Sequence, residues 1–261
     1  KRIHRGLTER GLDRGASSFV FAGESLGDPV VGRLIAHGLD DELAGTAYAV
    51  VDGIDGRTHH LRLPDLDAAG DSPPGSIVES RRFEDARGQK RVALAVRSDL
   101  SIEQQAIAPG ATWLDRRLVS RAPPALGEGG FGAEVSAAMR ARADQLIEQG
   151  LARRQNERLI FALDLLTTLR RRELDQVGAK LSVENGLPFV AAAPGEHVGG
   201  EYRRRLDLSS GRFAMIDDGL GFSLVPRSPS LERQLGRLVA GIARDDGAID
   251  WSFGRRRGLG L

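Results

Sequence analysis

Histidines and carboxylates are the side chains of this sequence that could hold a metal ion or move a proton. The histidines stand at positions 4, 37, 59, 60 and 197, and no two of them form a His-x-His pair. His59 and His60 are neighbours in a strand-like stretch, where successive side chains point to opposite faces. Because the two rings cannot easily bind one ion, we expect a packed His59 and a solvated His60.

Several other signatures of enzymatic sites are missing. The chain has no cysteine, which excludes disulfides, thiolate nucleophiles and cysteine zinc sites. No Gly-x-x-x-x-Gly-Lys occurs, and no Gly-x-Gly-x-x-Gly opens a helix after a strand. The densest acidic run, Asp40-Asp41-Glu42, has no second cluster at the spacing of a metal-binding loop and indicates a solvated turn. We therefore expect no catalytic residue, no metal and no cofactor in this chain.

Arginine dominates the cationic side chains. The chain has 37 lysines and arginines but a net charge of only +1, and lysine occurs only at positions 1, 90 and 180. A guanidinium group binds phosphate bidentately, which favours a nucleic-acid ligand. A GC-rich genome also replaces lysine by arginine, so both explanations of the composition stay open.

Short apolar runs broken by turn residues predict strands near the start and at the end of the chain. The expected strands are 30–35, 46–51, 57–63, 75–83 and 91–97, then 197–208, 212–217, 221–225, 238–243 and 248–253. Five short strands in about 70 residues are typical of a small barrel. Val31-Gly32 followed by 49–53 is echoed by Val198-Gly199 followed by 214–219, which favours two related copies, although any two strand–turn units share such features.

A helical period begins at residue 99. It predicts helices over 100–108, from Thr112 onward, over 131–149 and over 164–185, with a hairpin flanking 155–157. Three helices followed by a hairpin is the order of a winged helix-turn-helix. We therefore expect an α+β fold in which two small antiparallel β-barrel-like domains, SH3-like or OB-like, flank a helical, winged-helix-like centre.

The same pattern divides the chain into five parts. We expect a helix and linker at 1–28, a small β-barrel at 29–98, the winged-helix-like centre at 99–186, a second β-rich domain at 187–254 and a basic tail at 255–261. No stretch approaches the roughly 18 apolar residues of a membrane helix, and no secretory signal is visible. We expect a cytoplasmic protein that does not contact a membrane. Because the first residue is Lys1, we also expect the chain to be part of a longer polypeptide.

Arginines around the expected hairpin, on two helices and in the tail are the candidates for DNA contacts. In a winged helix the wing lies over the DNA backbone and the third helix enters the major groove. Arg142 falls in an apolar stripe and is expected to be paired and partly buried. The expected DNA-binding residues are Arg140, Arg153, Arg154, Arg158, Arg171, Arg172, Arg255, Arg256 and Arg257.

Two stretches carry a resemblance to a known family. Residues 110–119 read Gly-Ala-Thr-Trp-Leu-Asp-Arg-Arg-Leu-Val and residues 209–217 read Ser-Ser-Gly-Arg-Phe-Ala-Met-Ile-Asp. They resemble the C-terminal region of conjugative plasmid relaxases, the TraI-type mobilization nucleases, downstream of the catalytic domain. The resemblance continues through 30–33, 49–53, 169–174 and 254–258.

The resemblance implies a function beside the nuclease and not the nuclease itself. Relaxases cut DNA with a tyrosine and a metal held by three histidines, and this chain lacks that pattern. We expect a non-catalytic region that binds DNA around the plasmid transfer origin and assists assembly. The alternative is a protein–protein docking module that links a relaxase to the coupling protein of a type IV secretion channel or to other mobilization proteins.

Overall fold

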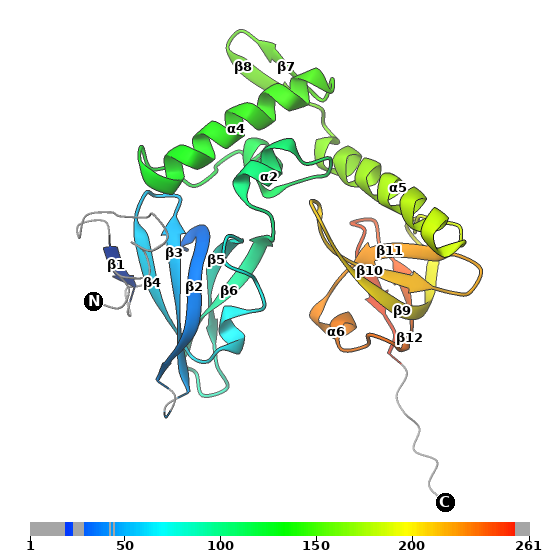
Figure 1. The fold of residues 1–261 in the computed structure, drawn as a ribbon, viewed down its shortest axis with the longest axis horizontal. Coiled ribbons are helices and arrows are strands. Elements are labelled where there is room, and N and C mark those ends of the chain that lie inside the picture. The colour runs from blue at the N-terminus through cyan, green and yellow to red at the C-terminus, as the bar shows by residue number, and fades with distance from the viewer. Residues whose placement is uncertain (1–18, 23–28, 42, 44, 254–261) are drawn as a thin grey trace, which may run out of the picture. The chain divides into compact units, whose positions relative to one another are not determined.

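The computed structural model describes residues 19–22, 29–41, 43 and 45–253, with only the backbone described for 19–22. The chain forms two compact units, each containing one large β-sheet (Figure 1). Unit 1 consists of the chain up to Ile107 together with Trp113–Ile160, and unit 2 consists of Ala108–Thr112 together with the chain from Phe161 on. Residues 1–18 and 23–28, which belong to the expected helix and linker, lie outside the described residues.

Unit 1 contains a six-stranded sheet in the order β1-β4-β3-β2-β5-β6. β1 pairs with β4 in parallel, and the other neighbouring strands pair antiparallel. Its β1 lies within residues 1–28, where the sequence predicted only a helix and a linker, so that part of the prediction is wrong. The strands are β1 (Phe19–Ala22), β2 (Val31–Asp41), β3 (Thr46–Gly53), β4 (Thr58–Leu63), β5 (Ile77–Glu84) and β6 (Lys90–Ser98).

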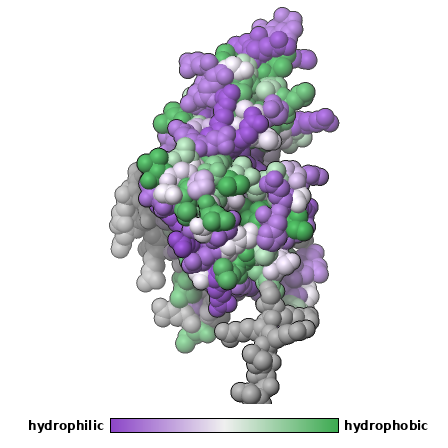
Figure 2. Space-filling model, turned by 90° about the vertical axis from the view of Figure 1, so that its right-hand side faces the viewer, coloured by the Kyte–Doolittle hydropathy of each residue, from purple (hydrophilic) through white to green (hydrophobic). Residues whose placement is uncertain are grey.

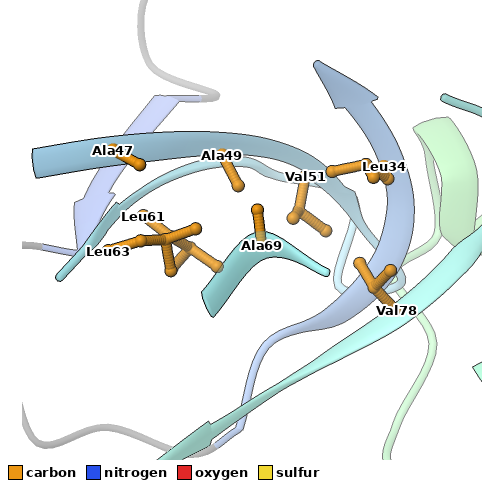
Figure 3. Close-up of a cluster of buried hydrophobic side chains, with 8 residues drawn as sticks. All are labelled: Leu34, Ala47, Ala49, Val51, Leu61, Leu63, Ala69 and Val78. Carbon is orange, nitrogen blue, oxygen red and sulfur yellow. The ribbon is translucent and has the colours of Figure 1, made fainter. Parts of the chain in front are cut away.

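Small and branched apolar side chains form the core of this sheet. Alternate residues of β3 and β4 point to the same face, because the side-chain period of a strand is two. A short 3-10 helix, η2 (Asp67–Ala69), places Ala69 against that face. Figure 3 shows the buried cluster, which consists of Leu34, Ala47, Ala49, Val51, Leu61, Leu63, Ala69 and Val78.

Unit 2 contains a five-stranded antiparallel sheet in the order β11-β10-β9-β12-β13. Its core includes Tyr202, which is completely buried, and Ile216. A short helix, α6 (Pro229–Glu232), begins where the Ser228 hydroxyl accepts a hydrogen bond from the Leu231 amide. The strands are β9 (His197–Leu208), β10 (Gly211–Asp217), β11 (Phe222–Pro226), β12 (Leu238–Ala243) and β13 (Ile249–Trp251).

The two sheets repeat one topology. In β2–β6 and in β9–β13 alike, the first strand lies between the second and the fourth, and a short helix connects the third strand to the fourth. Asp52 and Asp217 are buried near the ends of the two second strands. A Cβ atom on Gly32 or Gly200 would lie 2.1 or 2.2 Å from the carbonyl oxygen of the facing aspartate. The shared topology supports the duplication that the sequence echo indicates.

The expected barrels and winged-helix-like centre are wrong. The described parts of the chain are mostly β-structure, and no pairing in either sheet joins its outermost strands, so neither sheet closes into a barrel. The helices do not form a centre of their own. They are α2 (Ile102–Ile107), α3 (Trp113–Leu118), α4 (Gly130–Glu148) and α5 (Leu165–Asn185), which are divided between the two units.

Packing explains why the helices belong to the units of the sheets. Trp113 and Phe131 share a buried cluster with Ile54 and Ile77 of the first unit, so α3 and α4 complete a core that begins in the sheet. In unit 2, Leu181 of α5 packs with a similar set from the second sheet, Met215, Phe222 and Leu224. Sequence periodicity reveals that a helix has an apolar face but not what covers that face. No helix of the described residues is long and apolar enough to cross a membrane.

Candidate nucleic-acid interface

The hairpin expected around 155–157 is present in unit 1. It consists of β7 (Ala152–Gln155) and β8 (Arg158–Phe161), which form a two-stranded sheet after α4 (Figure 1). Asn156 and Glu157 form the turn with φ angles of 44° and 63°. Two consecutive residues with positive φ make the kind of two-residue turn that matches the twist of a hairpin.

This turn decides which side chains share a face. A two-residue turn sets Gln155 opposite Arg158, so Arg153, Gln155, Arg158 and Ile160 point to one side. All four are exposed. The other side carries Ala152, which is buried, together with Leu159 and Phe161, which are half-buried. We call the exposed group of Arg153, Gln155, Arg158 and Ile160 the open face of the hairpin.

The charges of the hairpin differ between its faces. Arg154, on the packed side, donates a hydrogen bond of 2.6 Å to Asp144 of α4 and is thereby neutralised. The guanidinium groups of Arg153 and Arg158 make no hydrogen bond or ion pair with any residue that the structure describes. The open face therefore presents two unpaired guanidinium groups, an amide and one apolar side chain to solvent.

Three further predicted DNA-binding residues lie on two helices. Arg140 is exposed on α4 and donates to the Ser136 hydroxyl at 3.1 Å. Arg171 and Arg172 are exposed on α5, in unit 2. The hydrogen bond from Thr168 is the main cause that lowers the pKa of Asp164, and the charges of Arg171 and Arg172 contribute less. Residues 255–257 lie outside the described residues.

Buried polar groups connect the helices of unit 1. Arg142 is completely buried, and its Nε and Nη2 atoms each donate a hydrogen bond of 2.8 Å to the buried carboxylate of Asp115. Gln145 accepts a third bond of 2.8 Å from Nη1. The expected pairing of Arg142 is confirmed, and its burial is complete.

A second polar cluster connects α4 to the sheet. Arg33 of β2 donates to Asp52 and to Glu134 of α4, each at 3.0 Å, and its guanidinium lies 4.6 Å from the centre of the Phe131 ring. Gly32 allows the close approach to the Asp52 carbonyl. Residues 30–33 and 49–53 are two of the stretches in which the sequence resembles relaxases. They are therefore in contact, and this contact has a structural role.

A third polar cluster lies in unit 2. It joins the beginning of the stretch 110–119 to the beginning of the stretch 209–217, the two stretches that carry the resemblance. Glu173 of α5 is buried and accepts hydrogen bonds from the backbone amides of Ser209 and Ser210 at 2.8 and 2.9 Å, and from the Ser209 hydroxyl. The Ser210 hydroxyl accepts a bond of 2.9 Å from the Ala111 amide. A Cβ atom on Gly110 would lie 2.0 Å from the Glu173 carboxylate, so only glycine fits there without displacement.

Glycines at 127, 129 and 132 form a Gly-x-Gly-x-x-Gly sequence at the start of α4, but no strand precedes it. A Cβ atom on Gly127 would lie 2.4 Å from the Asp55 carbonyl oxygen, and one on Gly132 would lie 2.4 Å from that of Ile54. These two glycines let the loop pack against the turn between β3 and β4. Packing of the loop therefore explains the spacing of these glycines, and no dinucleotide-binding role is needed to account for it.

Candidate catalytic groups are sparse. No three His, Asp or Glu side chains of the described residues gather as a metal site would require. His59 is buried as expected, and its Nε2 lies 3.0 Å from a carboxylate oxygen of Asp55. His60 is only half-buried and stacks on Tyr48 with ring centres 5.6 Å apart.

One short motif escaped the sequence analysis. Residues 23–27 read Gly-Glu-Ser-Leu-Gly, a match to the Gly-x-Ser-x-Gly elbow of hydrolases. These residues lie outside the described part of the chain. The next described element is the strand β2, whereas the hydrolase serine is followed by a helix. The match therefore carries no assignment.

Comparison with known proteins gives a family but no characterised relative. A family model described as "Protein of unknown function (DUF3363)" matches residues 1–87 and 79–260. No curated protein and no solved structure matches the chain. Because the two matched segments cover nearly the whole sequence, the chain belongs to the DUF3363 family.

Proposed function

We propose that this chain is a non-catalytic nucleic-acid-binding region and that the open face of the β7–β8 hairpin contacts phosphate groups. The observation that carries the proposal is the pair of guanidinium groups on that face, Arg153 and Arg158, which no described carboxylate neutralises. Arginine binds phosphate in a bidentate geometry. Contacts of this kind give affinity without reading sequence.

The experiment measures fluorescence anisotropy of labelled single- and double-stranded oligonucleotides between about 50 and 300 mM salt. Each phosphate contact contributes about 0.9 to the slope of log affinity against log salt for duplex DNA, and about 0.7 for a single strand. Replacing both Arg153 and Arg158 by Ala should therefore lower the slope by up to about 1.8 or 1.4. The double substitution should weaken binding to oligonucleotides of all sequences by about the same factor.

Arg154→Ala is the matched control. It removes the same side chain from the same hairpin, but from the packed side and from an existing ion pair with Asp144. Its salt slope should stay close to that of the wild-type chain. An unchanged slope in the Arg153/Arg158 double variant would contradict the proposal.

The resemblance to relaxases supplies the setting that we propose for this activity. The chain would be part of a cytoplasmic relaxase that processes plasmid DNA for conjugation, and would hold DNA of the transfer origin beside a nuclease domain elsewhere on the polypeptide. Arg153→Ala with Arg158→Ala in such a parent protein should lower plasmid transfer while nicking of the origin persists. Transfer at the wild-type frequency would contradict this setting.

An exposed apolar stripe in unit 2 favours a second function, docking to another mobilization protein or to a coupling protein. Leu238 and Ile242 lie on one side of β12 with 82% and 55% of their surface exposed, while Val239 and Ala243 on the other side are buried. Hydrophobic side chains also lie among hydrophilic ones on the face drawn in Figure 2. Exposed apolar groups of this kind are common in protein contacts.

The two functions respond to different substitutions. Replacing Leu238 and Ile242 by Ser should abolish capture of a mobilization partner and leave oligonucleotide affinity unchanged. Loss of DNA binding with partner capture intact would argue against docking by this stripe.

A further inference from the structure

Phe83 is an aromatic residue that the fold leaves outside its cores. The sequence offers Phe83, Phe213, Phe222, Trp251 and Phe253 as aromatics that could stack on bases. Phe213 and Phe222 are buried, and Trp251 is half-buried against Phe253. Phe83 lies on β5 and keeps 44% of its surface exposed.

Strand pairing shows what surrounds this ring. Phe83 pairs with Arg91 and Arg81 pairs with Ala93, so these side chains share one face of β5 and β6. Val78, Val92 and Leu94 lie on the opposite face, against the core of unit 1. The aromatic ring and its neighbouring arginines therefore point away from the core.

The β5–β6 hairpin extends past its pairing with β2 as a two-stranded ribbon, one face of which packs on the core of unit 1. β2 pairs with β5 only over Val31–Arg33, which leaves the stretch around Phe83 paired with β6 alone. Residues 81–91 contain five cationic side chains and two carboxylates. The guanidinium groups of Arg81 and Arg87 make no hydrogen bond or ion pair with the part of the chain that the structure describes.

The tip of the ribbon is ordered by its own hydrogen bonds. Asp85 accepts from the backbone amides of Arg87 and Gln89, each at 2.9 Å, and from Arg91 Nε at 3.1 Å. These bonds, the Gln89 amide first and the Arg91 side chain next, hold the pKa of Asp85 below its usual range. Arg91 also donates to the side chain of Gln89 at 2.6 Å. The loop is thereby fixed before any ligand arrives.

An open depression of about 360 Å³ lies beside the ring. Phe83, Arg87 and Arg91 line it together with Pro64, Asp65, Asp85 and Ala86. Its volume falls in the range of small-molecule sites. A flat aromatic wall with guanidinium groups at its rim matches the two parts of a nucleotide, a base that stacks and a phosphate that needs a cation.

We propose that the β5–β6 hairpin binds single-stranded nucleic acid, with one base stacked on Phe83 and the adjoining phosphates on Arg81 and Arg87. This inference rests on the proposed nucleic-acid-binding function and deepens it by naming the strand state and a second site. A single strand is required because the faces of duplex bases are already stacked on one another. Asp65 of the depression can accept a hydrogen bond from a base amino group.

The test compares Phe83→Ala with the wild-type chain on labelled oligo(dT), oligo(rU) and a duplex of the same length, about 12 nucleotides, which lies within known single-strand site sizes. Affinity for the single strands should fall about tenfold, the size expected for loss of one stacked base, and duplex affinity should stay unchanged. Phe83→Trp should restore binding, and its fluorescence should be quenched by the oligonucleotide. The dT and rU arms distinguish DNA from RNA as the natural strand.

Leu39→Ala is the matched control, because it removes an apolar side chain of unit 1 that is 49% exposed and lies on β2. It should leave every affinity unchanged. If the wild-type chain binds single strands and Phe83→Ala binds them equally well, the inference is overturned while the proposed function stands. If the wild-type chain binds no oligonucleotide, both fail, and Phe83-dependent self-association in sedimentation would then identify the ring as a protein contact.

Discussion

Removing the carboxylate of Asp115 should destabilise unit 1 more than any change to a surface ion pair. Asp115 and Arg142 have no exposed side-chain surface, and two hydrogen bonds of 2.8 Å join them. Asp115→Ala leaves the guanidinium charge buried without its counterion. Removal of one partner of a buried pair costs about 3–5 kcal/mol, because the remaining charge has lost both water and its partner.

The magnitude is large compared with the stability of a domain. Folded domains are stable by about 5–15 kcal/mol, so the substitution would remove a major part of that free energy. Replacing both partners, Asp115→Leu with Arg142→Met, leaves no uncompensated charge and should cost much less than the single change. The surface pair of Asp144 and Arg154, both more than half exposed, provides the contrast. Asp144→Ala should cost under about 1 kcal/mol.

Urea titration followed by tryptophan fluorescence measures these effects. The chain has two tryptophans, and a Trp251→Phe background leaves Trp113, which is buried in unit 1, as the reporter. The dependence of the free energy on urea should stay the same across variants, which shows that the midpoint reports stability. If Asp115→Ala costs no more than Asp144→Ala, the reasoning from an uncompensated buried charge is refuted.

Three further predictions concern unit 2. Glu173→Ala leaves the half-buried Ser209 amide and the buried Ser210 amide without an acceptor and should lower the free energy of unfolding by about 3 kcal/mol in a urea titration read by Trp251. Gly200→Ala should destabilise by about 1–3 kcal/mol more than Gly211→Ala, because both have positive φ but only at Gly200 would a Cβ meet backbone; equal costs would contradict this. Burial and then the charge of Glu232 raise the pKa of Tyr202, so absorbance at high pH should show it ionising above the ordinary value of about 10, with the signal lost in Tyr202→Phe. Because the pKa of Tyr202 is higher in the folded chain, the stability that Tyr202 contributes is present below about pH 10 and is lost as the pH rises above this value. Ionisation of Tyr202 at the ordinary pH would contradict this prediction.

Local structure could be predicted from the sequence because its signals are local. Alternation and turn residues predict the ten strands named in the sequence analysis and the hairpin around Asn156. A helical period predicts the helix that ends before Gly186. The segregation of Arg153 and Arg158 from Arg154 follows from the two-residue turn, since side chains alternate along a strand. Charge alone groups all three arginines, whereas this alternation separates them.

The arrangement of these elements could not be predicted in the same way. Arg33 meets Glu134 across 101 residues of sequence, and Arg142 meets Asp115 across 27. No periodicity specifies such partners. The expected winged-helix-like centre fails for the same reason: the order of helices and hairpin was right, but their apolar faces are completed by the sheets. Whether a sheet closes depends on the pairing of its outermost strands, which five short strands leave undecided.

The duplicated topology gives an argument about where binding resides. The hairpin of unit 2 that corresponds to β5–β6 is β12–β13, and its Arg244 is paired with Asp246 and Asp250. Arg203 of the same unit is paired with Glu201 and Asp217. In the β5–β6 hairpin of unit 1, Arg91 is paired with Asp85, but the guanidinium groups of Arg81 and Arg87 have no such partner among the described residues, and the exposed ring of Phe83 lies on the same hairpin. The corresponding hairpins of the two copies thus differ in that only the one in unit 1 combines unpaired guanidinium groups with an exposed aromatic ring, which favours this hairpin as a part of the chain that contacts a polyanion.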